Sequence, residues 1–217
     1  MIPCYLTNRD CLNPIRGMVE HLKRCDDVGQ ITIVDCASTY QPLLDWYADL
    51  DDVTVIRTTN LGPRAPWSHR HDDAPFYFVS DGDLDISEVP HDFLCRLRQG
   101  LIDHPQAIKA GLSLRLDDLP NDLPLTRGVR EMESQYWQTR IGDWYDAPID
   151  TTAALYRGHQ GWGGYGPAIR SAPPYMARHL AWYLRPGEIP PDWQHYLDHL
   201  SAEGILWTPR LKAACHS

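Results

Sequence analysis

Short apolar runs alternate with amphipathic segments through the first half of the chain. Apolar runs of strand length occupy residues 2–7, 31–34, 53–56, 75–80 and 107–112. After the first run, apolar side chains recur at helical spacing at positions 12, 15, 18, 19 and 22, and Asn13-Pro14 is the expected helix start. Further helices are predicted near residues 42–48 and 92–101. Strands that alternate with helices predict an α/β fold, in which a mainly parallel, Rossmann-like sheet is flanked by helices.

The second half of the chain has a weaker periodicity. Residues 129–141 fit a helix and Thr152–Tyr156 fits a strand, whereas the glycine-rich run Gly158–Gly166 predicts a mobile loop. No internal repeat and no low-complexity linker interrupts the sequence. We therefore expect a single domain that spans residues 1–217.

Composition narrows the class of protein. The 217 residues, 43% of them hydrophobic, are enough to bury one substantial core. No stretch approaches the roughly 20 apolar residues that a membrane span needs, and the N-terminus lacks an export signal, so we expect a cytoplasmic protein. Six irregularly spaced cysteines predict reduced thiols rather than a zinc site or a disulfide framework. A net charge of −9 disfavours nucleic acid as a partner.

An acidic run follows the apolar run at residues 75–80. Asp81 and Asp83 are separated by Gly82, and two carboxylates on one tight turn can hold a hard divalent cation such as Mg²⁺ or Mn²⁺. Such an ion bridges a diphosphate and neutralises the charge of a departing nucleotide. Alone, an Asp-x-Asp turn is more often merely solvated. Its position after the fourth strand of an alternating series favours a site, because such sheets bind ligands at the carboxyl ends of their strands.

Several motifs together resemble the family 2 glycosyltransferases of the GT-A fold, and more narrowly a group of small bacterial and phage-type members. The motifs are Tyr5–Arg9, Ile33–Tyr40, Asn60–Gly62 and Tyr77–Asp83, with the later runs Ile149–Arg157 and Ala177–Tyr183. The chain departs from that group at Cys36, Gln41 and Gly82, where the group commonly has Asn, Pro and Pro. The resemblance covers nearly the whole chain. It implies a nucleotide-sugar-binding half at about residues 1–112 and an acceptor-side half at about 113–217.

The resemblance also implies roles for particular residues. Binding of the donor nucleotide and its sugar diphosphate would involve Thr7, Asn8, Arg9, Asp35, Asn60, Arg64, Asp81 and Arg170, with Arg178 as a further candidate. His179 would join Asp81 and Asp83 as the third metal ligand. The residues leave other interpretations open: Asp35 fits an Asx turn, Arg64 a solvated loop, and His179 a histidine packed among aromatic side chains.

An inverting transfer needs a carboxylate that takes the proton of the acceptor hydroxyl. Asp150 is the first candidate and Glu133 the second, while Asp117 and Asp118 are candidates for positioning the acceptor. Each of these acids could instead cap a helix or turn, and a retaining enzyme would need no such base. Trp162 and Tyr165, within the glycine-rich run, are candidates for a lid over the donor.

The sequence thus predicts a metal-dependent, hexosyltransferase-like enzyme that uses Mn²⁺ or Mg²⁺ and a uridine- or guanosine-type sugar donor, with the uridine type favoured. The acceptor is an unidentified hydroxyl of a saccharide, of a small molecule or, less favoured, of a nucleic acid, and the oligomeric state is open. Nucleotidyl transfer is one alternative, although the usual glycine-rich phosphate loop is missing after the first strand. A non-catalytic nucleotide- or sugar-binding module is another. Two histidine clusters, at residues 69–71 and at 195 and 199, are interpreted as a polar loop and an exposed helix face.

Overall fold

A computed structural model describes residues 1–200 of the chain; residues 201–217, which include Cys215 and the end of the predicted acceptor-side half, lie outside the description. The strands are β1 (Ile2–Asn8), β2 (Val28–Cys36), β3 (Val53–Thr58), β4 (Phe76–Asp81), β5 (Leu84–Asp85), β6 (Lys109–Gly111), β7 (Ser113–Leu114), β8 (Arg140–Ile141), β9 (Trp144–Asp146), β10 (Ala154–Arg157), β11 (Ala168–Ser171) and β12 (Met176–His179). The α-helices are α1 (Leu12–Leu22), α2 (Gln41–Ala48), α3 (Ala65–His69), α4 (Phe93–Asp103), α5 (Thr126–Glu133) and α6 (Pro191–Asp198). Short 3₁₀ segments are η1 (Gly62–Arg64), η2 (Ser134–Trp137) and η3 (Leu180–Tyr183).

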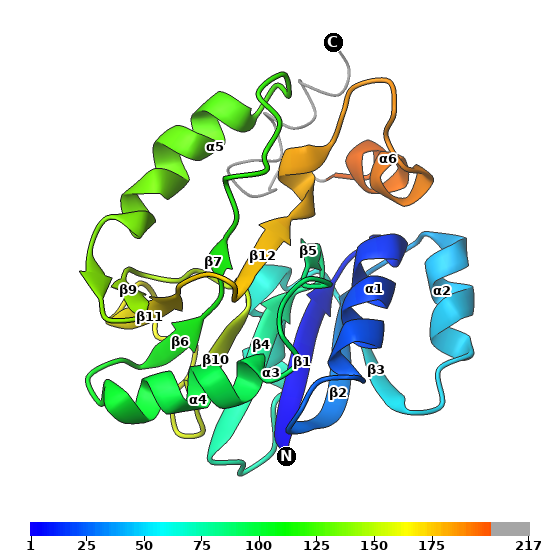
Figure 1. The fold of residues 1–217 in the computed structure, drawn as a ribbon. Coiled ribbons are helices and arrows are strands. Elements are labelled where there is room, and N and C mark those ends of the chain that lie inside the picture. Colours follow the sequence, from blue (N-terminus) through cyan, green and yellow to red (C-terminus); the bar gives the residue numbers. More distant parts are fainter. Residues whose placement is uncertain (201–217) are drawn as a thin grey trace.

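One large sheet runs through the described part of the molecule (Figure 1). Its strand order is β3-β2-β1-β4-β10-β6-β11-β9-β8. The first four strands are all parallel, as the alternation of strands and helices predicts. Beyond β4 the sheet is mixed, because β10 pairs antiparallel with both β4 and β6. The predicted α/β fold with a Rossmann-like sheet flanked by helices is confirmed, with the correction that the second half of the sheet is mixed rather than mainly parallel.

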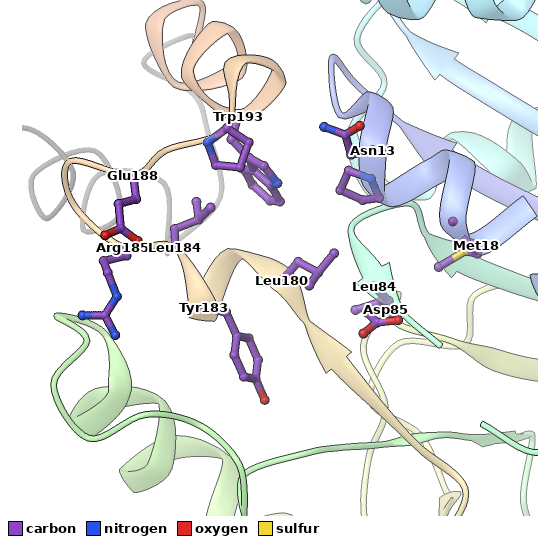
Figure 2. A pocket seen from close by; sticks show the side chains of 13 residues that line it. Asn13, Met18, Leu84, Asp85, Leu180, Tyr183, Leu184, Arg185, Glu188 and Trp193 are labelled. Carbon is purple, nitrogen blue, oxygen red and sulfur yellow. The ribbon is translucent and has the colours of Figure 1, made fainter. Parts of the chain in front are cut away.

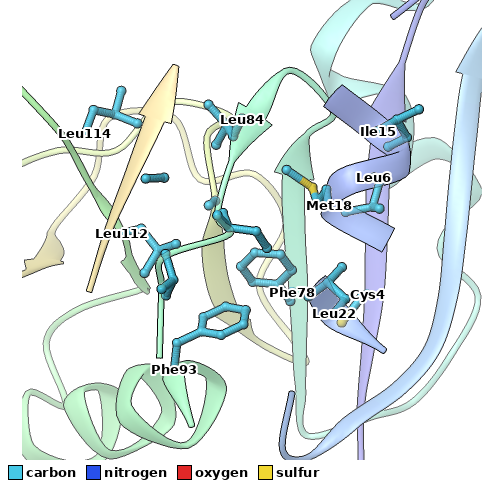
Figure 3. Close-up of a cluster of buried hydrophobic side chains, with 14 of the residues drawn as sticks. Cys4, Leu6, Ile15, Met18, Leu22, Phe78, Leu84, Phe93, Leu112 and Leu114 are labelled. Atoms are coloured by element: carbon cyan, nitrogen blue, oxygen red, sulfur yellow. The ribbon is translucent and has the colours of Figure 1, made fainter. Parts of the chain in front are cut away.

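The two faces of the parallel strands bury different sets of side chains, as the two-residue period of a strand requires. On one face, Leu6 of β1 and Phe78 of β4 pack with Ile15 of α1 and Phe93 of α4 in the main core (Figure 3). Residues from the other face of these strands form a smaller cluster, against which Trp67 of α3 packs. The sheet is therefore covered on both faces and its strand ends are left at the edge.

Several boundaries differ from those predicted. Helix α1 begins two residues earlier than expected, with Cys11 rather than Asn13 as the N-cap, and Pro14 lies at its third position, where a proline still costs no intrahelical hydrogen bond. The helix predicted at residues 129–141 begins at Thr126 and gives way to η2 and β8. Strands β5, β7, β8, β9, β11 and β12 and helix α3 were not predicted. Most are too short to carry a detectable hydrophobic period.

No helix among residues 1–200 is both long and apolar enough to cross a bilayer. The five cysteines in this part of the chain are free, as predicted.

Candidate active site at the strand carboxyl ends

The parallel strands bring the predicted donor-binding residues to one edge of the sheet. In the ladders, Thr7 of β1 pairs with Asp81 of β4, and Asn8 pairs with Asp35 of β2. These positions are the last or next to last of their strands. The prediction that Asp35 and the acidic run share the carboxyl edge is therefore confirmed.

Asp35 is held by groups of the protein itself. Its side chain is fully buried, one carboxylate oxygen accepts the Ser38 amide at 3.1 Å, and the other accepts the Tyr47 hydroxyl at 3.2 Å. That hydroxyl in turn accepts the amide of Asn8 at 2.8 Å. Asp35 thus binds the amide three residues on in its own loop, rather than forming the Asx turn that local sequence allowed, and together with Asn8 and Tyr47 it makes a buried polar chain beneath the strand ends. Burial and the charge of Asp35 raise the pKa of Tyr47, so that this phenol stays protonated.

A second buried carboxylate organises the neighbouring loop. Asp10 adopts a positive φ of 57° after β1, and its Oδ1 accepts the amides of Thr39 at 2.6 Å and Tyr40 at 2.9 Å. The loop after β2 is therefore tied to the loop after β1. A single acid in a polar turn carries no sequence signal for this role.

Gly82 is needed for space rather than for a left-handed backbone. Its amide donates to the carbonyl of Thr7 at 2.7 Å, which closes β4 tightly against β1. A Cβ at this position would lie 2.8 Å from that carbonyl oxygen and 3.0 Å from the Cδ1 atom of Ile15. Glycine is therefore required here because the backbones of Gly82 and Thr7 approach each other closely.

Asp81 is the more enclosed of the two acids. Its Oδ2 accepts the hydroxyl of Thr151 at 2.9 Å. Burial raises the pKa of Asp81 well above its usual range, and the negative charge of Asp83 adds to this effect. The charge of Asp150 raises it further. Negative charge is therefore concentrated here, and a bound cation would relieve it.

His179 lies beside Asp83 through a second, small sheet of order β5-β12-β7. Strand β12 pairs antiparallel with β5, so that His179 is opposite Leu84 and the Leu180 amide donates to the carbonyl of Asp83 at 3.0 Å. The Nδ1 atom of His179 is 3.7 Å from Oδ2 of Asp83, and its ring stacks on Trp182 with centroids 4.9 Å apart. The aromatic packing expected as the alternative is thus present as well.

The donor set fits a divalent cation in part. Nδ1 of His179 is buried and has no hydrogen-bond partner, and its distance from Asp83 is one that two ligands of one ion span. Carboxylate oxygens and a neutral imidazole nitrogen suit Mn²⁺. Within residues 1–200, however, no three His, Cys, Asp or Glu side chains converge closely enough to hold a metal as they stand. A cation would draw Asp81 toward the pair.

Glu133 and Arg170 bind each other. Both side chains are almost completely buried, Arg170 donates to the Glu133 carboxylate and to the carbonyl of Pro148 at 2.8 Å, and its guanidinium lies over Tyr136. Burial raises the pKa of Glu133, and the charge of Arg170 opposes this. A buried carboxylate engaged in this way does not fit a base that must reach an acceptor, and a buried guanidinium paired with it does not fit a contact to a donor diphosphate. Sequence reasoning named both residues without seeing that they are partners.

Asp150, the other predicted base, is exposed, and its charge acts on Asp81. Its backbone carbonyl accepts the ammonium of Lys109 at 3.3 Å. Lys109 is fully buried in β6, and burial lowers its pKa to about 8. This buried cation was missed. The signal available for it was a single lysine inside the apolar run 107–112.

The donor-side loop after β3 faces the glycine-rich run. Arg64 lies over the ring of Trp162 at 4.3 Å, and the Asn60 side chain accepts the Gly62 amide at 3.2 Å. Thr7 donates to the carbonyl of Pro63 at 3.3 Å, which joins this loop to β1. The predicted donor residues Asn60 and Arg64 therefore lie in one loop beside the end of β1.

Two other predicted basic residues have partners away from Asp81. Arg9 donates to the carbonyl of His199 at 3.0 Å, beside helix α6. Arg178 bonds Asp85, Glu88 and Asp118 in a surface network. Asp118 also accepts the hydroxyl of Tyr183 at 2.7 Å. Through these contacts Arg178 joins β12 to β5 and to Asp118, in the loop after β7.

A cavity of about 520 Å³ opens beside this region, between α1, β5 and the segment after β12 (Figure 2). It is lined by Asn13, Pro14, Gly17, Met18, Leu84, Asp85, Leu180, Tyr183, Leu184, Arg185, Glu188, Pro190 and Trp193. None of the predicted donor- or metal-binding residues is among them. The predicted site lies instead along the strand ends.

Comparison with known proteins found no matching family model and no matching curated protein. Among solved structures the chain is similar to Staphylococcus aureus TarS, with 15% identity and a TM-score of 0.45 over 72% of this chain and 47% of that one. It is also similar to glucosyl-3-phosphoglycerate synthase from Mycobacterium tuberculosis in complex with Mn²⁺, UDP-glucose and phosphoglyceric acid, with 12% identity and a TM-score of 0.45 over 73% of this chain and 56% of that one. A third similar structure is a CMP:2-keto-3-deoxy-manno-octonic acid synthetase complexed with CTP, with 12% identity and a TM-score of 0.42 over 73% of this chain and 75% of that one. The chain thus spans about half the length of the first two.

Tyr47→Phe should destabilise the protein by about 1–3 kcal/mol, because it leaves the buried Asn8 amide and an oxygen of Asp35 without their shared partner. Urea denaturation of the variant and the wild type measures this difference. Tyr165→Phe is the control, since Tyr165 is 65% exposed and should change stability by less than about 0.5 kcal/mol. Equal losses of stability in the two variants would contradict a stabilising role of the Asn8–Tyr47–Asp35 hydrogen bonds.

Lys109 should make stability depend on pH. Its pKa is about 8 in the folded chain, below the ordinary 10.5, so the unfolded chain binds more protons between these values. The contribution of this group to the free energy of unfolding therefore rises with pH in that window. Relative to Lys109→Met, the free energy of unfolding of the wild type should increase by about 1–3 kcal/mol between roughly pH 7.5 and pH 10. Denaturation at each pH measures this difference. A difference that stays constant with pH would contradict a lowered pKa.

Proposed function

We propose that the chain is a metal-dependent glycosyltransferase that moves a sugar from a nucleoside-diphosphate-sugar, with UDP as the favoured nucleotide, to a hydroxyl acceptor. The observation that carries this proposal is the unpartnered Nδ1 of His179, 3.7 Å from the carboxylate of Asp83 and just beyond the enclosed Asp81 at the carboxyl end of β4. These three side chains would hold Mn²⁺ or Mg²⁺, and the ion, when bound, would neutralise the charge of the departing diphosphate.

The residues around this point suit a nucleotide-sugar. Asn8 and Asp35, fixed by Tyr47, form a polar floor at the ends of β1 and β2, on which the base and ribose would lie beside Thr7 and Arg9. Asn60 and Arg64 flank the place of the sugar and diphosphate. Arg64 offers a guanidinium for anionic oxygens.

Asp150 is the base that we propose for an inverting transfer. It is exposed and its charge reaches Asp81, so that an acceptor hydroxyl between it and the donor sugar could lose its proton to it. Glu133 does not serve this role in the proposal, because Arg170 occupies it.

Asp83→Asn and His179→Ala should each abolish the response to metal and donor. With Mn²⁺ and a panel of nucleotide-sugars, the wild type should hydrolyse or transfer at least one donor and should melt at a higher temperature. Each variant should lower turnover by roughly 100- to 1,000-fold, the loss expected when a stabiliser of developing charge is removed. The measurements are release of nucleoside diphosphate and thermal melting.

Asp85→Asn is the matched control, because Asp85 belongs to the same acidic run and its carboxylate pairs with Arg178 at 3.2 Å. It should retain turnover. Indifference of the wild type to every donor, with and without metal, would overturn the proposal. Consumption of a nucleoside triphosphate with release of pyrophosphate would instead show nucleotidyl transfer.

Asp150→Asn should lower the rate of transfer to an acceptor by roughly 100- to 10,000-fold while leaving donor affinity unchanged, since a general base acts on the acceptor proton. Steady-state kinetics with the active donor separates the two effects. Asp146→Asn, at an exposed acid of β9, is the control and should transfer at the wild-type rate. A weakened donor affinity with normal kcat would contradict the role of base.

A further inference from the structure

Lys109 is an ammonium group enclosed by backbone oxygen. Its Nζ donates to the carbonyls of Asp150 at 3.3 Å, Trp162 at 3.3 Å and Gly164 at 2.9 Å. An ammonium has three donors, and here each of the three has its own acceptor. The rings of Tyr156 and Trp162, at 5.5 and 5.8 Å, close the sides of the site. All three hydrogen-bond acceptors of this buried charge are therefore neutral carbonyls, and the negative charge of Asp150 stabilises it in addition.

The three carbonyls come from two different segments. One belongs to the turn of Asp150, and the next residue, Thr151, donates to Asp81. The other two belong to the glycine-rich segment, residues 158–166, whose Trp162 ring lies under Arg64 of the donor-side loop. Lys109 is thus the point at which the acidic turn and the glycine-rich segment are joined.

The glycine-rich segment depends on such contacts for its shape. Gly163 and Gly164 have φ values of 69° and 60°, a conformation that glycine permits but does not enforce. Near the start of the segment, Arg70 donates to the carbonyl of Gly158 and Tyr77 to that of Gln160. Toward its end, Lys109 supplies the side-chain donors to Trp162 and Gly164. Loss of these would free the part that carries Trp162 and Tyr165.

We propose that Lys109 is a positioning residue that couples the placement of Asp150 to the conformation of the segment 158–166, so that the proposed base and the Trp162 side of the donor site are ordered together. The catalytic part of this inference rests on the proposed function. The coupling itself concerns the backbone and is tested separately.

Hydrogen–deuterium exchange on the full chain tests the coupling. In Lys109→Met, amides of residues 149–152 and of residues 158–166 should both exchange at least about tenfold faster, while β1 and β2 keep the wild-type rates. Lys23→Met, at an exposed lysine whose ammonium binds Asp52, is the matched control and should leave both segments unchanged. Faster exchange in only one segment, or throughout the sheet, would overturn the proposal.

The wild-type chain provides the same test without a substitution. The charged and titratable groups that face Lys109 are Asp150, Arg170 and the phenol of Tyr156. As the pH rises through about 8, the ammonium loses a proton and with it one of its three donors. Because the pKa is lowered only while Lys109 is enclosed, an open state would keep the proton and rising pH favours the closed state, so protection of both segments, corrected for the intrinsic exchange rate, should rise together between about pH 8 and pH 10. Protection that stays constant with pH would overturn the coupling through Lys109 even if Lys109→Met failed to fold.

Kinetics tests the catalytic part. Lys109→Met should lower kcat roughly 10- to 100-fold and leave the KM for the donor within about twofold, since misplacement of a reacting group costs rate rather than binding. Added to Asp150→Asn, it should cause no further loss, because both act through one carboxylate. Additive losses would overturn the positioning role. If the wild type turns over no donor, the proposed function fails while the exchange data still decide the coupling.

Discussion

Negative charge gathered at the end of a buried strand is the constraint around which this structure is arranged. Strand β4 carries fully buried side chains up to Ser80 and then turns at Asp81, and the Gly82 amide binds the Thr7 carbonyl so closely that the turn has no room for a Cβ. Asp81 and Asp83 are therefore fixed near one another at the edge of the core. Burial and mutual repulsion make this arrangement costly for the bare carboxylates, which is a condition that a bound cation reverses.

Polar groups beneath the strand ends keep this edge rigid. The Asn8–Tyr47–Asp35 chain links β1, α2 and β2, and Asp10 fixes the loop that follows β2. Asn8, Tyr47 and Asp35 need no ligand to be satisfied, since each finds a partner within the protein, whereas Oδ2 of Asp10 is buried without a hydrogen bond. A nucleotide would thus meet a surface whose shape is already set, and binding would cost little conformational entropy.

Sequence patterns predicted the strands that have an apolar run and missed the contacts between residues far apart in the sequence. The strands near residues 2–7, 31–34, 53–56 and 75–80 each have an apolar run, and their order implied that Asp35 and Asp81 share an edge. The approach of His179 to Asp83 depends on pairing between two short strands far apart in sequence, and two-residue β5 has no period to detect. Glu133 and Arg170 were both named as site residues, yet no local pattern reveals that two distant charges neutralise each other in the core. For Asp35 the local sequence allowed both an Asx turn and a ligand contact, and the structure contains instead a bond from the Ser38 amide, three residues on.

The sheet also changes how the two predicted halves relate to one another. Residues beyond 112 do not form a separate layer, because β10 inserts antiparallel between β4 and β6, and β11 pairs with β6. This insertion brings Thr151 to Asp81 and Asp150 within electrostatic reach of it. The enclosure that raises the pKa of Asp81 is thus built partly by the second half of the chain. A cation at this point would therefore be bound by side chains of both halves, with Asp81 and Asp83 from the first and His179, in the small sheet, from the second, so metal binding and acceptor placement would be linked through contacts between the two halves.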